Sequence, residues 1–364
     1  MTNLRTPGPT PLPPEILQAQ AQPMVDHRGP EFQACLQTVT ANLKTLFQTR
    51  NDMIVLTGSG TGGMEAVVVN TLSPGDKVLV VSIGAFGDRF VSIIKAFGGD
   101  VVPLAVEWGK AADPDAIRKA LDANPAVKAV FITHNETSTG VTNPMRDIAP
   151  VVKGFGKLLV VDGISGLGSL DLPVDELKID VAVAGSQKGW MASPGVSMVS
   201  VSPTGWEAIA KAKMPRFYWD FTRAKDIAAR GQTPWTPAVS VFFGMDVGLK
   251  MLLKEGLANI FARHARIGKA TRDGVKSLGL ALVADERFAS NTVTAVVGPI
   301  GVDIAKLRKL LREKHDVVVA GGQGKLEGKI FRIGHMGLVS LADIKEVIDS
   351  LADVLPEAGF VKAK

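Results

Sequence analysis

The sequence predicts an α/β fold with a large domain, built on a mostly parallel sheet covered by helices, and a smaller α+β domain. The chain has 364 residues, which is more than one hydrophobic core usually organises. With 46% of its residues apolar and 21% charged, it has the composition of a compact globular protein. Through its first two hundred residues, apolar runs of strand length alternate with helical segments, and this alternation is typical of α/β folds.

The strands expected in the large domain are apolar on both faces. They are MIVL at 53–56, KVLVV at 77–81, KAVFIT at 128–133, KLLVV at 157–161, DVAVA at 180–184 and VSMVSV at 196–201. A strand with one wet face alternates apolar and polar residues, whereas a strand covered on both faces does not. We therefore expect helices on both sides of this sheet.

The domain limits follow from the proline-rich start and from two long helices. Five prolines within the first fourteen residues oppose helix and regular sheet, and we expect an extended N-terminal arm over residues 1–20. We expect helices at 238–256 and 258–279 to connect the two domains, so we place the large domain at 21–255 and the small domain at 256–364. The small domain has expected strands at 292–297, 316–320 and 329–334, and expected helices at 303–315 and 341–355.

Charge and composition exclude several classes of protein. The net charge of +5 comes from 41 basic and 36 acidic residues scattered along the chain, which indicates a solvated surface rather than a nucleic-acid interface. Cys35 is the only cysteine, so we expect no disulfide within the chain and no metal site. No signal peptide and no apolar run of about 18 residues is present. We expect a cytoplasmic protein that binds neither nucleic acid nor membrane.

A glycine-rich turn follows the first strand, in TGSGTGGMEAVVVNTL. Gly58, Gly60 and Gly63 match GxGxxG, which raises the alternative of an NAD-dependent oxidoreductase. That fingerprint needs an acidic residue about 20 positions on, whereas the second strand ends in Ser82 and Gly84. A Walker A loop is excluded because no lysine follows the last glycine.

The remaining interpretations of this turn are a phosphate site and a tight turn without a ligand. Ser59, Gly60 and Thr61 stand at the start of the following helix. Unpaired backbone N–H groups and the positive end of the helix dipole bind phosphate at such a position.

Two further candidate catalytic residues, Asp162 and Lys188, lie at strand ends. Asp162 ends an apolar strand, where a protonated pyridine nitrogen would be a suitable partner for its charge; capping of the following loop is the alternative. Lys188 follows another apolar strand, 26 residues, one strand and one helix later. Desolvation there would lower its pKa and free the amine for carbonyl chemistry, whereas a solvated lysine is the alternative. Neighbouring strands would bring both residues to one edge of the sheet.

Arg332 lies within an apolar strand of the small domain, GKIFRIGHMG. Its planar guanidinium matches a carboxylate through two parallel hydrogen bonds. From a second domain it could close over a substrate, and a structural ion pair is the alternative.

Taken together, these residues resemble the class V (fold type I) pyridoxal phosphate (PLP)-dependent aminotransferases, and most of all the alanine–glyoxylate and serine–glyoxylate aminotransferases. The resemblance covers nearly the whole chain and rests on motifs in a matching order. These motifs are PGPTPLP at 7–13, FQTRN at 47–51, GSGTGGMEA at 58–66, HNETSTGV at 134–141, VDGISGLG at 161–168, AGSQKG at 184–189, FYWD at 217–220, TPWTPAV at 233–239 and FRIGHMG at 331–337. It implies a seven-stranded, mostly parallel sheet and a homodimer with the active site at the subunit interface.

The resemblance also implies a role for individual residues. Lys188 would carry PLP as a Schiff base and move a proton, and Asp162 would pair with the pyridine nitrogen. Thr137 would contact the phenolic side of the ring, Ile164 would pack against a ring face, and Phe86 would be the aromatic residue that stacks on the ring. The phosphate would be held by Ser59, Gly60, Thr61 and Gln187, with Thr233 and Thr236 from the partner subunit. Arg332 would bind the substrate carboxylate near the backbone of Gly8.

The implied activity is transfer of an amino group from alanine or serine to a 2-oxo acid, glyoxylate above all, by a ping-pong mechanism. Two positions depart from the family pattern: Phe86 stands where a tryptophan is common, and Thr233 stands where animal relatives have a tyrosine. The donor stays open, because aspartate, ureidoglycine or an aminoethylphosphonate would use the same chemistry.

The single cysteine and one histidine raise three competing interpretations. A cysteine-desulfurase-like lyase needs a mobile cysteine, but Cys35 falls in an expected helix at 31–47. Some relatives bear a hydrogenase-subunit name, yet one cysteine cannot ligate an iron–sulfur cluster. His134 could be a base, and we favour packing near the cofactor instead.

Overall fold

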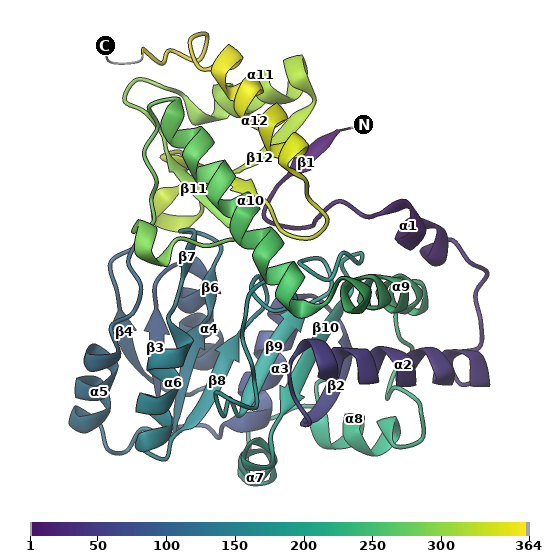
Figure 1. The fold of residues 1–364 in the computed structure, drawn as a ribbon. Coiled ribbons are helices and arrows are strands. Elements are labelled where there is room, and N and C mark those ends of the chain that lie inside the picture. Colours follow the sequence, from purple (N-terminus) through teal and green to yellow (C-terminus); the bar gives the residue numbers. More distant parts are fainter. Residues whose placement is uncertain (1, 362–364) are drawn as a thin grey trace.

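The computed structural model describes residues 2–361. Its large domain is built on a seven-stranded sheet (Figure 1). In spatial order the strands are β2 (Asp52–Thr57), β10 (Val196–Val201), β9 (Val181–Gly185), β8 (Leu158–Asp162), β5 (Ala129–Thr133), β3 (Lys77–Ser82) and β4 (Asp100–Ala105). β10 runs antiparallel to both of its neighbours, β2 and β9, and the other neighbouring pairs are parallel. The predicted α/β class and the mostly parallel sheet are confirmed.

The sheet has a helical layer on each face. Successive strand residues point to opposite faces, so Leu79 and Val81 belong to one core cluster while Val78 and Val80 belong to the other. The first core includes α2 (Pro30–Leu46), α5 (Pro114–Ala123), α6 (Met145–Gly154) and α9 (Val239–Glu255). The second includes α3 (Gly60–Thr71), α4 (Ala85–Ala96), α7 (Pro203–Lys211) and α8 (Phe221–Ala228). The runs predicted to be covered on both faces are therefore covered as expected.

The sequence analysis missed strand β4. Its apolar residues are interrupted by Pro103, and all six residues are half-buried or exposed. β4 lies at the edge of the sheet and pairs only with β3. An edge strand tolerates a proline because one side of the strand makes no ladder hydrogen bonds.

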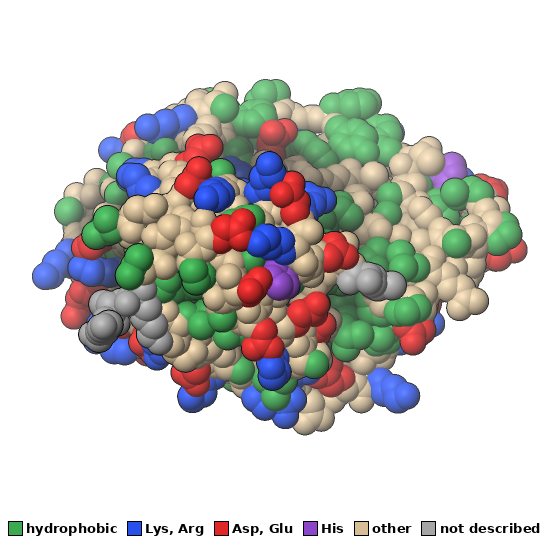
Figure 2. Space-filling model, turned by 90° about the horizontal axis from the view of Figure 1, so that it is seen from above, with side chains coloured by type: hydrophobic (Ala, Val, Ile, Leu, Met, Phe, Trp, Pro, Cys, Tyr) green, Lys and Arg blue, Asp and Glu red, His purple; other side chains and the backbone are tan. Residues whose placement is uncertain are grey.

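The small domain has its own four-stranded sheet, in the order β1 (Asn3–Arg5), β12 (Val317–Gly321), β13 (Ile330–Gly334) and β11 (Val293–Val297). Helices α11 (Ile304–His315) and α12 (Leu341–Val354) pack on it and enclose a separate core. Helix α10 (Leu257–Ser277) runs from the large domain into the small one (Figure 1). Acidic and basic side chains are mixed on this side of the molecule (Figure 2).

The N-terminal segment differs from the predicted extended arm. Residues 3–5 form β1, which pairs in parallel with β12, and residues 14–20 form helix α1 (Pro14–Gln20). The prediction of an extended chain is therefore wrong for 14–20. Pro14 occupies the first turn of the helix, where the missing N–H has no partner to lose. Between the two elements, residues 6–9 form bends and residues 10–13 have no regular secondary structure.

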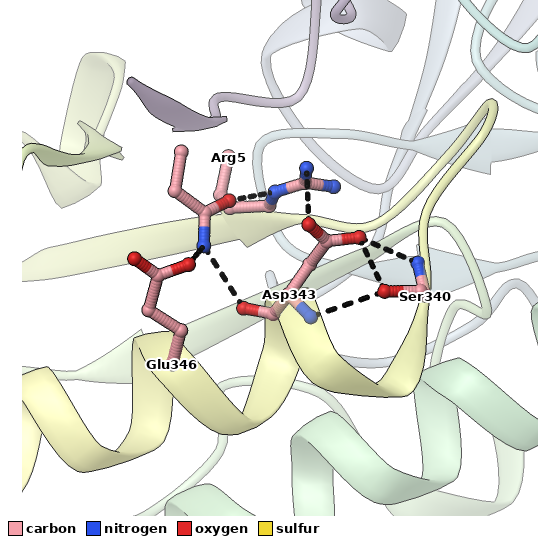
Figure 3. A network of polar contacts seen from close by, with 5 residues as sticks. Arg5, Ser340, Asp343 and Glu346 are labelled. Atoms are coloured by element: carbon pink, nitrogen blue, oxygen red, sulfur yellow. Dashed lines mark hydrogen bonds and ion pairs between the residues drawn. The ribbon is translucent and has the colours of Figure 1, made fainter. Parts of the chain in front are cut away.

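A polar network fixes β1 to helix α12 (Figure 3). The buried Arg5 guanidinium lies 3.5 Å from Asp343 Oδ1 and also donates to the Asn3 side chain. Asn3 Nδ2 donates to Glu346 Oε2 over 2.8 Å and to the Asp343 carbonyl over 3.0 Å. Asp343 in turn forms a capping box with Ser340 at the start of α12. The first residues of the chain are thus part of the small domain.

One predicted helix is absent. Residues 163–180, between β8 and β9, form turns rather than the helix expected between Asp162 and Lys188. No helix within residues 2–361 combines the length and apolar character that a bilayer span requires.

Candidate active site

Asp162 and Lys188 meet at one edge of the large sheet. β8 and β9 are parallel neighbours with Asp162 opposite Val183, and Lys188 follows β9 by three residues. This is the juxtaposition predicted from the sequence. The Asp162 carboxyl is buried, accepts a hydrogen bond from the Ile164 N–H over 2.9 Å, and has the Thr133 hydroxyl at 3.4 Å. Burial raises the pKa of Asp162 to about 6, and the charge of Lys188 opposes that rise.

The Lys188 amine is buried under the N-terminal segment. Its Nζ donates a hydrogen bond to the Pro7 carbonyl, and the Thr10 hydroxyl donates to the Lys188 carbonyl over 3.2 Å. Burial lowers the pKa of Lys188 to about 8, with Asp162 opposing that shift. The alternative of a solvated lysine is therefore wrong.

Gly8 lies directly against this lysine. A Cβ built at Gly8 would lie 2.7 Å from Lys188 Nζ, and its φ of +113° is one that other residues rarely adopt. The structure thus brings Gly8 to the site, as predicted, and only glycine fits there.

The predicted phosphate turn begins helix α3. The Ser59 hydroxyl caps the helix by accepting from the Gly62 N–H over 3.2 Å. The Gly60 and Thr61 N–H groups have no acceptor among residues 2–361, as is usual in a first helical turn. The Gln187 side-chain oxygen is buried without a partner. A Cβ built on Gly185 would lie 3.0 Å from this oxygen and 3.5 Å from the Gly60 Cα, so Gln187 lies beside the turn.

Arg89 is a residue of this region that the sequence analysis did not single out. It lies one turn after Phe86 on α4, in GAFGDR. Its guanidinium carbon is 4.5 Å from the centre of the Phe86 ring, and its Nη1 donates to the Thr61 hydroxyl over 2.9 Å. Its charge also lowers the pKa of Asp162 and of Lys188, although burial is the largest influence on both.

Thr137 and Ile164 lie where the predicted ring would be enclosed. Thr137 is buried, and its hydroxyl donates to Ser165 Oγ over 2.8 Å. The Ile164 side chain packs over Gly60, where a Cβ would lie 2.8 Å from Ile164 Cδ1. Thr137 stands on the turn between β6 (Asn135–Glu136) and β7 (Val141–Thr142), a hairpin that follows β5, and Ile164 stands on the turn after β8. Both therefore lie at the same sheet edge as Lys188.

Arg332 reaches from β13 of the small domain to the large domain. Its Nη1 lies 3.2 Å from both the Thr137 carbonyl and Gln323 Oε1, and its Nε donates to the Gly321 carbonyl over 2.7 Å. Within residues 2–361 it forms no ion pair with a carboxylate, so the alternative of a structural ion pair is wrong. Burial lowers the pKa of Arg332 to about 10, and Glu136 opposes that shift. An incoming carboxylate would meet a buried cation without a paired anion.

His134 and Cys35 do not have the features of catalytic groups. Burial lowers the pKa of His134 to about 4, so its ring is neutral near pH 7, and its Nδ1 faces Gly166 without a hydrogen bond. Cys35 lies on α2, and burial raises the pKa of its thiol to about 12. A thiol with that pKa is a poor nucleophile.

Thr233 and Thr236 lie in the segment between α8 and α9. The Thr233 hydroxyl donates to the Trp235 carbonyl over 2.8 Å, and Thr236 is exposed. Neither hydroxyl forms a hydrogen bond with Lys188, Asp162 or residues 59–61 in the part of the chain described. Their contribution to a partner subunit stays a prediction.

The residues present fit PLP, part by part. The free N–H groups at the start of α3 and the Arg89 guanidinium suit its phosphate, and the half-buried Gln187 would have to donate to it through its side-chain NH₂ group. Asp162 is a buried carboxyl that a cationic ring nitrogen would stabilise in its ionised form, and Lys188 is a desolvated amine suited to an aldehyde. No group of three or more His, Cys, Asp or Glu residues is arranged to hold a metal ion within residues 2–361.

The chain is similar to several named proteins along nearly its whole length. It is 46% identical over 359 residues to the soluble hydrogenase 42 kDa subunit of Anabaena cylindrica, covering 98% of this chain and 94% of that protein. It is 38% identical to L-aspartate–glyoxylate aminotransferase of Paracoccus denitrificans (97% and 91% covered). It is 36% identical to serine–glyoxylate aminotransferase of Methylorubrum extorquens (99% and 94% covered).

The fold is equally similar to that of a solved relative. The crystal structure of alanine–glyoxylate aminotransferase from Nostoc sp. matches with a TM-score of 0.93 at 31% identity, and the match covers 97% of this chain and 95% of that one. The model of the class V aminotransferases matches residues 4–339. This chain belongs to the class V aminotransferase family.

Proposed function

We propose that this enzyme transfers the amino group of a small amino acid, alanine or serine, to a 2-oxo acid, glyoxylate above all. The observation that carries this proposal is the arrangement around Lys188. A desolvated amine lies beside a buried carboxyl, Asp162, and shares the site with a buried arginine that lacks an anionic partner, Arg332. A transaminase needs an electron sink, a proton carrier and a carboxylate clamp.

The chain is a PLP-dependent transaminase, as its family membership shows. When bound, PLP supplies an aldehyde that condenses with amines and a cationic ring that accepts electrons. In our proposal Ser59, Gly60, Thr61 and Gln187 hold its phosphate, and Arg89 joins them. Asp162 keeps the ring nitrogen protonated because a buried carboxylate is stabilised by an adjacent positive charge.

Lys188 and Arg332 act on the substrate in this proposal. The Lys188 amine, with its lowered pKa, takes a proton from the substrate α carbon and returns it, since a group with a pKa near the working pH can do both. Arg332 binds the substrate carboxylate with its guanidinium. The Pro7 carbonyl and Gly8 cover the amine and exclude water from it.

Glyoxylate is the proposed acceptor because it recurs in the names of relatives that differ in their donor. Those names give alanine, serine and aspartate as donors. Aspartate is therefore the second candidate donor, on the strength of the Paracoccus relative.

We also propose a homodimer, with Thr233 and Thr236 reaching the phosphate of the partner subunit's site. An exposed aromatic cluster beside these threonines supports it. Tyr218 stacks on Trp235, and Phe217, which is 72% exposed, lies 5.1 Å from the Trp235 ring. Exposed aromatic clusters commonly mark protein interfaces. A cytoplasmic location is proposed on the single cysteine of the chain.

The test is a screen of single half-reactions with the PLP-loaded enzyme. Alanine, serine, aspartate, ureidoglycine and aminoethylphosphonate are each mixed with it, and the conversion of the bound cofactor to its amine form is followed by absorbance. Glyoxylate, pyruvate and oxaloacetate are then offered for the return reaction. We expect alanine or serine to react at least about tenfold faster than aspartate, a difference of about 1.4 kcal/mol in transition-state binding.

The control for this screen is Lys188→Ala, which should lose the half-reactions with every donor while still binding some cofactor. If aspartate reacts faster than alanine and serine, aspartate is the donor instead. If Lys188→Ala keeps full activity, the proposed role of Lys188 is wrong.

A further inference from the structure

Helix α4 has no cap of its own. Gly84 stands at its N-cap position and has no side chain to accept a hydrogen bond from the first turn. The first N–H groups of the helix are instead bound by side chains about fifty residues later. The Ala85 N–H donates to Ser138 Oγ over 2.9 Å, and the Phe86 and Gly87 N–H groups donate to Glu136 Oε2 over 3.0 and 3.2 Å.

Gly84 is required by the close approach of these side chains rather than by its backbone conformation. Its φ of 169° is extended and open to any residue. A Cβ at Gly84 would lie 2.4 Å from Glu136 Cγ and 2.5 Å from Ser138 Oγ. The helix start and the 136–138 turn are therefore fitted to one another.

Glu136 is fully buried, and burial raises its pKa to about 7, a rise that the hydrogen bonds from Ser138 and Gly87 oppose. Both of its carboxyl oxygens accept hydrogen bonds, as in an ionised carboxylate. Oε1 accepts from the Ser138 N–H over 3.1 Å and from the Ser138 hydroxyl over 2.7 Å, while Oε2 serves α4. The positive end of the helix dipole also stabilises a negative charge at this position. The Arg332 guanidinium lies close enough to Glu136 for the carboxylate to raise the pKa of the arginine, against the larger effect of burial.

The segments on either side of the Glu136 carboxylate lead to two residues with proposed roles in binding, one toward the cofactor ring and one toward the substrate. On α4, Phe86 is the proposed stacking residue. In the turn, Thr137 lies between Glu136 and Ser138, and its carbonyl accepts from Arg332 Nη1 over 3.2 Å. Glu136 thus links the ring-stacking helix to the arginine that would hold the substrate carboxylate.

We propose that Glu136 is a positioning residue, which fixes Phe86 and Arg332 relative to each other by holding the start of α4 against the 136–138 turn. This inference rests on the proposed roles of Phe86 and Arg332. The reaction needs the ring and the substrate carboxylate in one geometry, because small misplacements of reacting groups cost large factors in rate.

Glu136→Gln is the sharpest test, because it keeps the shape of the side chain. The amide can still accept from α4 with its oxygen, but its NH₂ group then faces the Ser138 N–H, donor against donor. For the PLP-loaded variant we expect the KM for the amino donor to rise about tenfold and the visible circular dichroism of the bound cofactor to change in shape. Glu107→Gln, which alters an exposed acid paired with Lys110, is the matched control and should change neither.

A role in folding alone would lower the melting temperature and leave both of these readouts, measured per bound cofactor, as in the wild type. That result would overturn the proposal. If Glu136→Gln does not fold, Ser138→Ala replaces it. This variant removes the acceptor of the Ala85 N–H and one donor to Glu136. The KM for the amino donor should rise about two- to fivefold, and the circular dichroism of the bound cofactor should change in the same sense as in Glu136→Gln. Unchanged readouts in Ser138→Ala would then overturn the proposal.

Failure of this inference is distinguishable from failure of the proposed function. If the wild-type enzyme transaminates none of the donors screened, the function is wrong. If the wild type is active and the Glu136 and Ser138 variants match it in KM and in circular dichroism, only the positioning role is wrong.

Discussion

At the scale of single residues, the environment of Lys188 determines how the enzyme takes up its cofactor. An ordinary lysine has a pKa near 10.4, whereas burial lowers the pKa of Lys188 to about 8. Only the neutral amine attacks an aldehyde. Below pH 8 the neutral fraction rises about tenfold per pH unit, and above pH 8 it levels off.

We predict that the rate at which the cofactor-free enzyme binds PLP covalently follows this fraction. It should rise steeply from pH 6 to 8 and become flat above pH 8, as measured by stopped-flow absorbance. The same reaction with a free lysine derivative corrects for the titration of PLP itself. A rate that continues to rise tenfold per unit up to pH 10 would show that Lys188 is not desolvated.

Arg89 is expected to add a full positive charge to the proposed phosphate site. A helix N-terminus contributes only about half a positive charge, and the phosphate of PLP carries up to two negative ones. Replacing Arg89 by Met keeps the stem and removes the charge. We expect affinity for PLP to fall about 10- to 100-fold, the loss of a charged hydrogen bond, with affinity for unphosphorylated pyridoxal unchanged. Equal losses for both ligands, measured by equilibrium titration, would assign Arg89 to the ring instead.

The sequence predicted the residues at strand ends, together with Arg332 and Gly8, and missed contacts that depend on how distant segments meet. Asp162 and Lys188 follow apolar strands, so the sheet itself brings them together. The Pro7 carbonyl on Lys188 could not be predicted, because a backbone atom leaves no mark in the sequence. Arg89 and Glu136 lay within the motifs GAFGDR and HNETSTGV, but their roles depend on how α4 meets the 136–138 turn.

At the scale of elements, the short strand β1 couples the N-terminal segment to the small domain. Arg5 fixes β1 to α12 (Figure 3), and the chain then crosses Gly334, where a Cβ would lie 2.2 Å from the Thr6 carbonyl oxygen. Arg332 lies two residues before Gly334 on β13. The Pro7–Gly8 cover therefore adjoins the sheet that carries the proposed carboxylate clamp.

Replacing Arg5 by Met should loosen this cover without touching the large domain. Loss of the partly buried ion pair and the bond to Asn3 should destabilise the protein by about 1–3 kcal/mol. We expect faster hydrogen exchange in residues 3–10 and a higher KM for the donor, with the rate of PLP uptake equal or higher. Arg312→Met, on the exposed side of α11, is the control. Unchanged exchange in residues 3–10 and an unchanged KM would show that β1 is held by its strand pairing alone.

The predictions of helices and strands were wrong where the local sequence pattern did not determine the structure. β4 was missed because Pro103 interrupts its apolar residues, which an edge strand tolerates. α1 was missed because prolines at a helix start look like an irregular segment. The turns at 163–180 were expected to form a helix by analogy with the other strand connections. In contrast, α9, α10, α11 and α12 agree with their predicted spans within two residues, since each has a clear apolar periodicity.

At the scale of the whole molecule, the proposed dimer can be tested by complementation. Lys188→Ala disables a site from within one chain, and Thr233→Val with Thr236→Val would disable the partner's site. Each mixed dimer would then hold one site that lacks all three changes. Unfolding and refolding the two inactive variants together should restore about one quarter of wild-type activity, given random pairing. Recovery no greater than the sum of the parents would place both threonines in their own subunit's site or outside any site.

The pairing of β1 with β12 also bears on how the protein is made. Asn3 pairs with Val317, so the first strand to leave the ribosome waits for a partner made near the end of synthesis. At about 5–20 residues per second this delay lasts roughly 15–60 seconds. During it the nascent chain already holds β8 and β9, while β1 lacks its partner strand and the segment over Lys188 is held only by its contacts with the large domain. Ribosome-arrested chains ending before β12 should therefore be cut by trypsin after Arg5, whereas the released protein should resist, and equal resistance of both would show that the segment docks without the small domain.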